Sequence, residues 1–285
     1  MKINTITPDS HPYLTPLTAL AKVPSSIYYR GNLPEKRIPS VAIVGTRKPT
    51  RYGQEVAATF AAELTKRGVI IISGLALGTD TIAHRACLDA GGTTIAVLSG
   101  SVDRITPQTN RDLGEAIIAQ GGAVLSEYEP PTAPRDFQFL ARNRIVSGLA
   151  DAVLITEAAA RSGTLSTAAR ALEQGKEVFV VPGNITSPMS AGCNNLLKQG
   201  AHPATCTDDI LEIIAPDLLR PQASLPLGST PLETKILSLI QGGIRDGDAM
   251  HQQAGVPVTE FNQALTMLEL AGTIRALGAN QWTLR

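Results

Sequence analysis

Cations next to glycines are the residues best suited to chemistry in this 285-residue chain. In VAIVGTRKPTRYG (41–53), a short apolar run ends at Gly45 and Thr46, and Arg47 and Lys48 follow directly. Arginine can grip a phosphate through two parallel hydrogen bonds, and lysine adds a point charge. The stretch therefore predicts phosphate binding. It matches neither standard fingerprint for NAD or ATP, because GxGxxG does not follow the strand and GxxxxGKS/T is found nowhere in the sequence.

Two further turns combine glycine with small polar residues, and each precedes an expected helix. They are Ser73, Gly74, Leu75, Ala76, Leu77 and Gly78, and Arg161, Ser162, Gly163 and Thr164. Backbone amides at a helix N-terminus favour anions, and glycine lets a phosphate approach the backbone closely. Together with the turn at Gly45, these turns predict a phosphate pocket. The alternative is that all three are only tight turns.

The stretch RDFQFLARNRIVSGLAD places Arg142, Asn143 and Arg144 close to Phe137 and Phe139. Cations beside aromatic rings are the parts of a surface for single-stranded nucleic acid, because charge follows the backbone and rings stack on bases. The alternative is that the two phenylalanines are core residues of a helix and the arginines are solvated. We favour the core for the phenylalanines and a binding role for the arginines.

Two carboxylates are candidates for catalysis, but we expect a structural role for each. Asp80 and His84 are spaced as neighbours on one helix face, as an acid/base pair would be. Asp at a helix start, however, more often satisfies free backbone amides. Glu157 follows a strand end without an evident partner. No catalytic residue is predicted.

Apolar runs alternate with amphipathic stretches in the first 215 residues. The runs are residues 41–44, 69–72, 94–98, 123–128, 152–156 and 177–183, and the helix-like stretches are residues 52–67, 80–90, 111–120, 137–149 and 164–175. This alternation predicts an α/β fold with a mostly parallel sheet and helices on both faces. Ligands of such sheets bind outside the carboxyl ends of the strands, so the three glycine turns are expected to meet there.

The composition along the chain predicts four parts. Residues 1–37 are expected to form an ordered arm packed on the core, followed by the main domain at 38–215. The Pro-, Ser- and Gly-rich stretch 216–230 is expected to be a linker. Three helical stretches and a hairpin in 231–285 predict a winged helix domain.

Charge and cysteine usage limit the classes of function. The formal net charge is zero, so nucleic-acid binding would need a local patch rather than a broad basic face. The three cysteines and four histidines are scattered, so neither a disulfide framework nor a metal site is predicted. No secretory h-region or membrane-length apolar run is present, which predicts a cytoplasmic chain that does not enter a membrane.

Several long blocks, in order, make the chain resemble the DprA (Smf) family of bacterial DNA-processing proteins. They are VAIVGTR (41–47), SGLALGTDTIAH (73–84), AVLSGSVDRITPQTN (96–110), LSEYEPP (125–131), ARNRIVSGLAD (141–151), SGTLSTAARALEQGKEVFVVPGNI (162–185) and GCNNLLKQGA (192–201). The resemblance covers residues 8–285. It implies an extended Rossmann-like fold that binds single-stranded DNA without cofactor or catalysis. It also implies a homodimer that loads the RecA recombinase onto DNA during natural transformation.

Combined with the resemblance, the turns predict a site in which successive DNA phosphates meet backbone amides and arginines. The predicted DNA-binding residues are Gly45, Thr46, Arg47, Lys48, Ser73, Gly74, Leu75, Ala76, Gly78, Phe139, Arg142, Asn143, Arg144, Ser162, Gly163 and Thr164. The amides are expected from the turns at Gly45, Gly74 and Gly163. Leu140 stands where the family usually has proline, and no departure from the family pattern removes a charge from this site.

Two alternatives belong to other classes of protein. One is a nucleotide-binding enzyme similar to the phosphoribohydrolases, which share the extended Rossmann fold; the turn at Ser162, Gly163 and Thr164 lacks the glutamate that follows their PGGxGT motif. The other is a winged-helix transcription regulator. Against it, the expected recognition helix at 258–271 contains Glu260 and Glu269 and neither lysine nor arginine.

Overall fold

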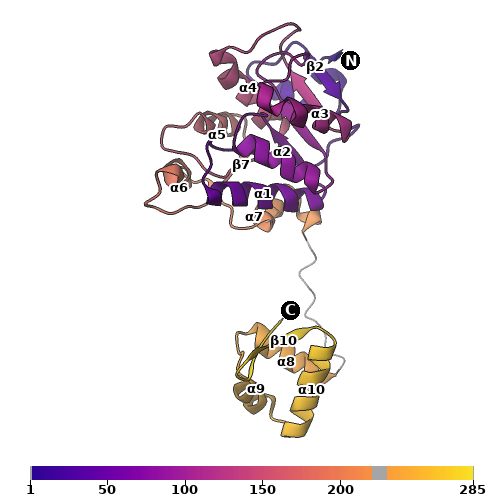
Figure 1. Cartoon of the computed structure of the whole chain (residues 1–285), viewed down its shortest axis with the longest axis vertical. Coiled ribbons are helices and arrows are strands. Elements are labelled where there is room, and N and C mark those ends of the chain that lie inside the picture. The colour runs from indigo at the N-terminus through magenta and orange to yellow at the C-terminus, as the bar shows by residue number, and fades with distance from the viewer. Residues whose placement is uncertain (1, 220–229, 285) are drawn as a thin grey trace. The chain divides into compact units, whose positions relative to one another are not determined.

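The computed structural model describes residues 2–219 and 230–284, and the chain divides into two compact units, residues 1–219 and 220–285 (Figure 1). Residues 220–229 of the predicted linker lie outside the described residues. Its first residues form a 3-10 turn, η5 (Pro216–Leu218), and the Leu218 carbonyl accepts a hydrogen bond from Arg67 Nη1 at 2.7 Å. The packed part of the first unit therefore continues past residue 215, where the sequence had suggested a boundary.

A nine-stranded sheet forms the centre of the N-terminal unit (Figure 1). The strand order is β1-β2-β6-β5-β4-β3-β7-β8-β9, and every pair from β6 to β9 is parallel. The strands are β1 (Asn4–Ile6), β2 (Ile27–Gly31), β3 (Ser40–Val44), β4 (Ile70–Ser73), β5 (Thr94–Val97), β6 (Ala123–Ser126), β7 (Ala152–Ile155), β8 (Glu177–Val180) and β9 (His202–Pro203). The predicted mostly parallel sheet is confirmed. The predicted arm also supplies β1 and β2, which extend the sheet as antiparallel edge strands.

Helices cover both faces of the sheet, as predicted. They are α1 (Arg51–Lys66), α2 (Thr79–Asp89), α3 (Arg111–Ala119), α4 (Asp136–Leu149), α5 (Thr164–Glu173), α6 (Ala191–Lys198) and α7 (Thr207–Ile214), with the 3-10 turns η1 (Pro8–Ser10), η2 (Thr15–Ala19), η3 (Gln108–Asn110) and η4 (Pro188–Ser190). Alternate residues of β3 face opposite layers. Ala42 and Val44 join the core with α4, α5 and α6, whereas Val41 and Ile43 join the core with α1, α2 and α7. Because both faces are covered, β3 is apolar on both faces rather than alternating apolar with polar.

The C-terminal unit is the predicted winged helix. Its elements are α8 (Pro231–Gln241), α9 (Gly247–Ala254), α10 (Val258–Leu270), β10 (Ile274–Gly278) and β11 (Gln281–Leu284), the last two forming an antiparallel hairpin. Thr230 caps α8 by accepting a hydrogen bond from the Glu233 amide at 3.2 Å. Ile236, Phe261 and Leu265 pack in a core of its own. The C-terminal unit therefore has a hydrophobic core separate from that of the first unit.

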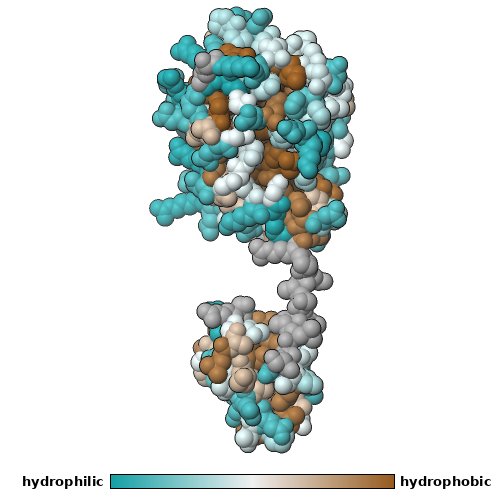
Figure 2. Space-filling model, turned by 90° about the vertical axis from the view of Figure 1, so that its right-hand side faces the viewer, coloured by the Kyte–Doolittle hydropathy of each residue, from teal (hydrophilic) through white to brown (hydrophobic). Residues whose placement is uncertain are grey.

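The surface of both units is mixed. Figure 2 shows hydrophilic side chains over much of one face of each unit, with apolar side chains between them. Within residues 2–219 and 230–284, no helix has the length and apolar character needed to cross a membrane.

Candidate functional site

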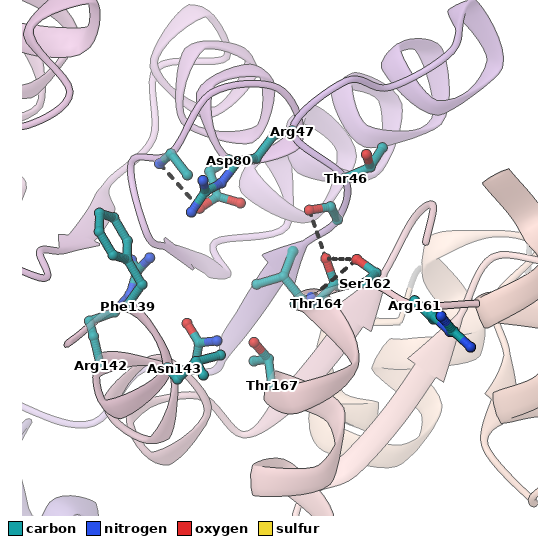
Figure 3. Close-up of a pocket in the computed structure, with 15 residues that line it drawn as sticks. Thr46, Arg47, Asp80, Phe139, Arg142, Asn143, Arg161, Ser162, Thr164 and Thr167 are labelled. Atoms are coloured by element: carbon teal, nitrogen blue, oxygen red, sulfur yellow. Dashed lines mark hydrogen bonds between the residues drawn. The ribbon is translucent and has the colours of Figure 1, made fainter. Parts of the chain in front are cut away.

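The candidate site lies where the strand order of the sheet reverses. From β3 the order runs through β4, β5 and β6 to one side and through β7, β8 and β9 to the other. The loops that leave the carboxyl ends of β3 and β7 diverge at such a point, which leaves room for a ligand. A cavity of about 440 Å³ opens there (Figure 3). It is the place where the sequence predicted a phosphate pocket.

Residues from all the predicted segments meet at this cavity. The predicted residues that line it are Gly45, Thr46, Arg47, Ala76, Phe139, Arg142, Asn143, Ser162, Gly163 and Thr164. The lining residues that were not predicted are Val44, Asp80, Leu140, Arg161 and Thr167. The predicted residues that do not line it are Lys48, Ser73, Gly74, Leu75, Gly78 and Arg144. Four of these six lie at the end of β4 or in the turn that follows it.

Ala76 is the one residue of the turn after β4 that lines the cavity, and its neighbours support the cavity. Ser73 is fully buried and its hydroxyl donates to the Ile43 carbonyl at 2.7 Å. Leu75 is also fully buried and packs in an apolar cluster. Gly78 has φ +80°, and a Cβ there would come within 2.6 Å of the Arg47 backbone. These residues therefore fix the loop that carries Arg47.

The predicted cradle of backbone amides is wrong at three positions, because these amides already have partners within the chain. The Thr46 amide donates to the Glu157 carbonyl at 2.9 Å. The Gly74 amide donates to Asp80 Oδ2 at 3.1 Å. The Thr164 amide donates to Ser162 Oγ at 3.2 Å. The cavity consequently offers a ligand mainly side chains.

Arg47 and Phe139 form the most direct binding pair in the cavity. The guanidinium carbon of Arg47 lies 5.3 Å from the centre of the Phe139 ring, which is a cation–π distance. Arg47 is exposed and Phe139 is half-buried. The expectation of a core position for the two phenylalanines is therefore wrong, since Phe137 is 62% exposed as well. Only Phe139 of the two faces the cavity.

Arg142 and Arg144 are less available than predicted. Arg142 is buried, and its Nη1 donates to the Val97 carbonyl at 2.6 Å. Arg144 lies outside the cavity and forms an ion pair with Glu127 in which both side chains are mostly buried. Arg144 is thus a structural residue. Arg142 still borders the cavity, but its Nη1 is already used in the hydrogen bond to the Val97 carbonyl.

The charge that faces Arg142 is the carboxylate of Asp80. Its Oδ2 accepts hydrogen bonds from the amides of Gly74 and Ala76 at 3.1 and 3.2 Å. Burial raises the pKa of Asp80, while the Arg142 charge and these amides favour its ionised form. Burial likewise lowers the pKa of Arg142, and the Asp80 charge opposes that shift. The expected structural role of Asp80 is confirmed.

Asp80 and His84 do not form an acid/base pair. His84 is fully buried, and its Nδ1 lies 2.7 Å from the Thr94 hydroxyl instead. Burial first, and the Arg142 charge second, lower the pKa of His84 to about 3. The imidazole is therefore neutral at physiological pH. It does not line the cavity.

Hydroxyl and amide side chains supply the rest of the polar lining (Figure 3). Thr164 Oγ1 donates to the Gly45 carbonyl at 2.9 Å and so ties α5 to the loop after β3. Ser162 Oγ lies 3.1 Å from Thr164 Oγ1. Asn143 Nδ2 donates to Ser166 Oγ at 2.9 Å, which leaves its oxygen toward the cavity side. The hydroxyl hydrogens of Ser162 and Thr164 are thus used within the chain, so Arg47 is the main donor that this wall of the cavity offers to a phosphate.

Arg161 and Thr167 are two of the five lining residues that sequence reasoning did not assign to the site. Arg161 was recognised as part of its turn but was not assigned to the site. Its position beside Gly163 in a loop at the carboxyl edge was the available signal. Thr167 lies one helical turn after Gly163, so the helical spacing could have identified it. Nowhere in the described ranges do three or more His, Cys, Asp or Glu side chains gather as metal ligands would.

Comparisons with known proteins identify related chains. A family model described as DNA recombination-mediator protein A matches residues 4–215, and a model of the DprA winged helix domain matches residues 220–280. Protein Smf of Escherichia coli (strain K12) is 37% identical over 293 aligned residues, which cover 97% of this chain and 76% of that protein.

Two solved structures are similar over most of the chain. DNA processing protein A from Streptococcus pneumoniae is 38% identical with a TM-score of 0.69, and the match covers 75% of both chains. DNA processing protein A from Helicobacter pylori, solved to explain its single-stranded DNA binding mode, is 35% identical with a TM-score of 0.67. That match covers 76% of this chain and 97% of the other.

Proposed function

Because this chain belongs to the DprA family of DNA-processing proteins, we propose that it binds single-stranded DNA in the cavity around Arg47 and Phe139. The observation that carries the proposal is the exposed Arg47 guanidinium held over the Phe139 ring at a cavity lined by hydroxyls. A guanidinium binds a phosphate and a ring stacks on a base, so together they suit adjacent parts of one nucleotide.

A single strand fits this arrangement better than a duplex. Bases of a duplex are stacked inside it, whereas those of a single strand are free to enter a cavity or stack on an aromatic ring. Thr46 lines the same cavity, and its hydroxyl can donate to a phosphate oxygen, which carries no sequence information. Binding should accordingly depend little on sequence. The relative from Helicobacter pylori, whose structure concerns single-stranded DNA binding, supports this assignment.

We further propose that the protein acts as a recombination mediator that protects incoming single strands and loads RecA onto them in natural transformation. The match to the family model of a recombination mediator supports this role. A homodimer formed through the Rossmann-like domain at 38–215 would present two cavities and raise avidity by effective concentration. The proposed setting is the cytoplasm.

The site is proposed to bind without catalysis. Among the described residues that line the cavity, Asp80 supplies the only carboxylate. Its Oδ2 accepts hydrogen bonds from two backbone amides, and the side chain is buried beside Arg142. Cleavage of a glycosidic bond needs an acid or base free to exchange protons with the substrate. Asp80 is held as a structural anion instead.

The test is a binding titration with single- and double-stranded DNA of equal length at several salt concentrations. We expect clearly tighter binding of the single strand. The logarithm of affinity should fall with the logarithm of salt concentration by about 0.7 for each phosphate contact. Equal affinity for both forms, or stronger binding of the duplex, would contradict the proposal. A second titration, in which the protein restores RecA assembly on strands already covered by a single-strand binding protein, tests the mediator role separately.

A further inference from the structure

A second cavity lies beside the first at the same edge of the sheet. It has a volume of about 380 Å³ and is lined by residues from the end of the β3–α1 loop, the first turn of α1, the loop after β7 and the segment after β8. The lining residues are Thr50, Tyr52, Glu157, Pro182, Gly183, Asn184, Ser187 and Ser190. The loops that follow β3 and β7 line both cavities, which makes the two neighbours.

One wall of the second cavity is an anchored aromatic ring. Tyr52 lies in the first turn of α1, is 46% exposed, and donates its phenol hydrogen to the Pro182 carbonyl at 2.7 Å. The segment that receives this bond is itself fixed. Asn194 pairs with both the amide and the carbonyl of Gly183, at 3.3 and 3.1 Å. A Cβ on Gly183 would come within 2.2 Å of Ser190 Oγ. The ring is therefore held in place while much of its surface stays open to solvent.

The charge inside the second cavity disfavours a phosphate there. Glu157 is buried, and its two carboxylate oxygens accept hydrogen bonds from the Thr50 amide at 2.9 Å and the Thr50 hydroxyl at 2.8 Å. Thr50 in turn caps α1 by accepting from the Gly53 amide at 3.2 Å. The carboxylate is thus structural, but it remains a negative charge that repels an anion. A flat, uncharged group that can stack on Tyr52 fits the cavity better.

Cations lie in the two chain segments that contribute lining residues to both cavities, 45–52 and 157–164. Arg47 and Lys48 follow β3, Arg51 begins α1, and Arg161 lies in the loop after β7. All four are exposed, and none of them makes an ion pair within the described parts of the chain. Figure 3 shows Arg161 turned away from Asn143 and Thr167, on the far side of Ser162. Charge that follows a backbone, with an aromatic ring beside it, is the arrangement of a single-strand binding groove.

We infer that the second cavity is a base-stacking subsite. A DNA strand held by Arg47 at the first cavity would continue across Lys48, Arg51 and Arg161, and a following base would stack on Tyr52. This inference rests on the proposed function, because it extends the same strand. Its occupant is a nucleobase of single-stranded DNA. An aromatic side chain of another protein is the alternative that the experiment below distinguishes.

The experiment measures how affinity depends on strand length. Oligothymidylates of about 4 to 16 nucleotides are titrated against the full chain and against Tyr52→Ala, Tyr52→Phe and Leu172→Ala. Leu172 is 59% exposed on α5 and lines neither cavity, so its variant controls for loss of an exposed apolar side chain. Tyr52→Phe keeps the ring and removes only its bond to Pro182. In parallel, oligonucleotides that carry 5-iodouracil are photo-crosslinked, and the attached residue is identified by mass spectrometry.

We expect Tyr52→Ala to bind the long strands about ten- to a hundredfold more weakly, since this is the size of one lost base stack. The shortest strands should bind it as they bind the unchanged protein. Tyr52→Phe and Leu172→Ala should still bind long strands more tightly than short ones, as the unchanged protein does. The crosslink should map to Tyr52.

The inference is overturned if Tyr52→Ala binds long strands normally, or if it weakens short and long strands equally. It is also overturned if the crosslink maps only to the first cavity. If the unchanged protein binds no single strand of any length, the proposed function fails as well. If strands bind normally at the first cavity and Tyr52→Ala has no effect, only the inference of a second subsite is overturned, and the proposed function is not.

Discussion

The Arg47 guanidinium carbon lies 5.3 Å from the centre of the Phe139 ring, so one exposed cation of the cavity rests on an aromatic face. The two residues come from the loop after β3 and from α4, segments that are far apart in sequence. A cation–π contact at such an exposed position contributes about 0.5–1 kcal/mol. Its larger effect is to orient both groups toward one ligand.

The Arg47→Ala substitution is expected to weaken single-strand binding by about 1–3 kcal/mol, because a charge-assisted contact to phosphate is lost. The salt dependence should also flatten by about 0.7, the share of one phosphate contact. Titrations at several salt concentrations measure both effects. Arg170→Ala is the matched control, since Arg170 is an exposed arginine of α5 that pairs with Glu173 and lines neither cavity. An unchanged affinity and slope for Arg47→Ala would refute the site.

The two phenylalanines of α4 should differ in their effect on binding. Phe139→Ala should reduce single-strand affinity by about 1–3 kcal/mol through the loss of base stacking. Phe137→Ala should change it little, because Phe137 is exposed but does not line the cavity. Fluorescence anisotropy with a labelled strand compares them directly. Equal losses for both variants would mean that the ring contact is not confined to the cavity.

Loss of Arg142 should act mainly on folding. Arg142→Met removes the charge that favours the ionised form of the buried Asp80. It also removes the hydrogen bond from Nη1 to the Val97 carbonyl, and a bond from a charged group contributes about 1.5–3 kcal/mol. Denaturant unfolding followed by far-UV circular dichroism measures the change in the free energy of unfolding. Asp80→Asn combined with Arg142→Met should recover part of the loss. A variant of normal stability that no longer binds DNA would show that Arg142 is a binding cation after all.

His84 should make the N-terminal unit less stable in mild acid. Its pKa is lowered to about 3 in the folded protein from 6.5, so between these values the unfolded chain binds more protons than the folded one. The stability that His84 contributes is thus complete above pH 6.5 and is lost as pH falls toward 3. The slope is about 1.4 kcal/mol per pH unit within this window.

The slope is measured as the difference between the unchanged chain and His84→Gln, whose side chain can still bond Thr94 but does not titrate. Fluorescence of Trp282 is an internal control, because it is the single tryptophan and lies in the C-terminal unit. The change in Trp282 fluorescence between two pH values should be the same in the unchanged chain and in His84→Gln. Parallel pH slopes for the two proteins by circular dichroism would contradict the assignment.

The winged helix should not bind duplex DNA on its own. Lys235, Arg245, Arg275 and Arg285 oppose Glu233, Asp246, Asp248, Glu260 and Glu269 in residues 231–285, and four minus five gives −1. Helix α10 exposes Val258, Met267 and Leu270 along with Glu260 and Glu269. Apolar side chains also reach the surface of this unit in Figure 2. This surface favours contact with a protein over counterion release from DNA.

Residues 228–285 expressed alone and titrated with random duplex at low salt test this expectation. Weak or undetectable binding is expected. Micromolar or tighter binding by the fragment would contradict it. So would a chain that remains dimeric without this unit yet loses most of its affinity for single strands.

The sequence alone was sufficient to predict the fold. Runs such as Val41 to Val44 are apolar at every position, as in strands that are covered on both faces of a sheet. Helical stretches lie between these runs, and few topologies other than a parallel sheet connected by helices fit this order. The helix, helix, helix and hairpin order of residues 231–285 likewise predicts the winged helix. The cavity was predictable in position, because the turn at Gly45 and the turn at Gly163 follow strands whose carboxyl ends share one edge.

Only the tertiary structure decided which groups of the turns remain available. The Thr46 amide donates to the Glu157 carbonyl, and Arg144 forms an ion pair with Glu127. Each partner belongs to a different segment of the chain. Arg142 likewise donates to the Val97 carbonyl, which lies on a distant strand. A local pattern shows what an arginine or an amide can bind. Whether that group is free depends on contacts between distant segments, which exist only once the chain has folded.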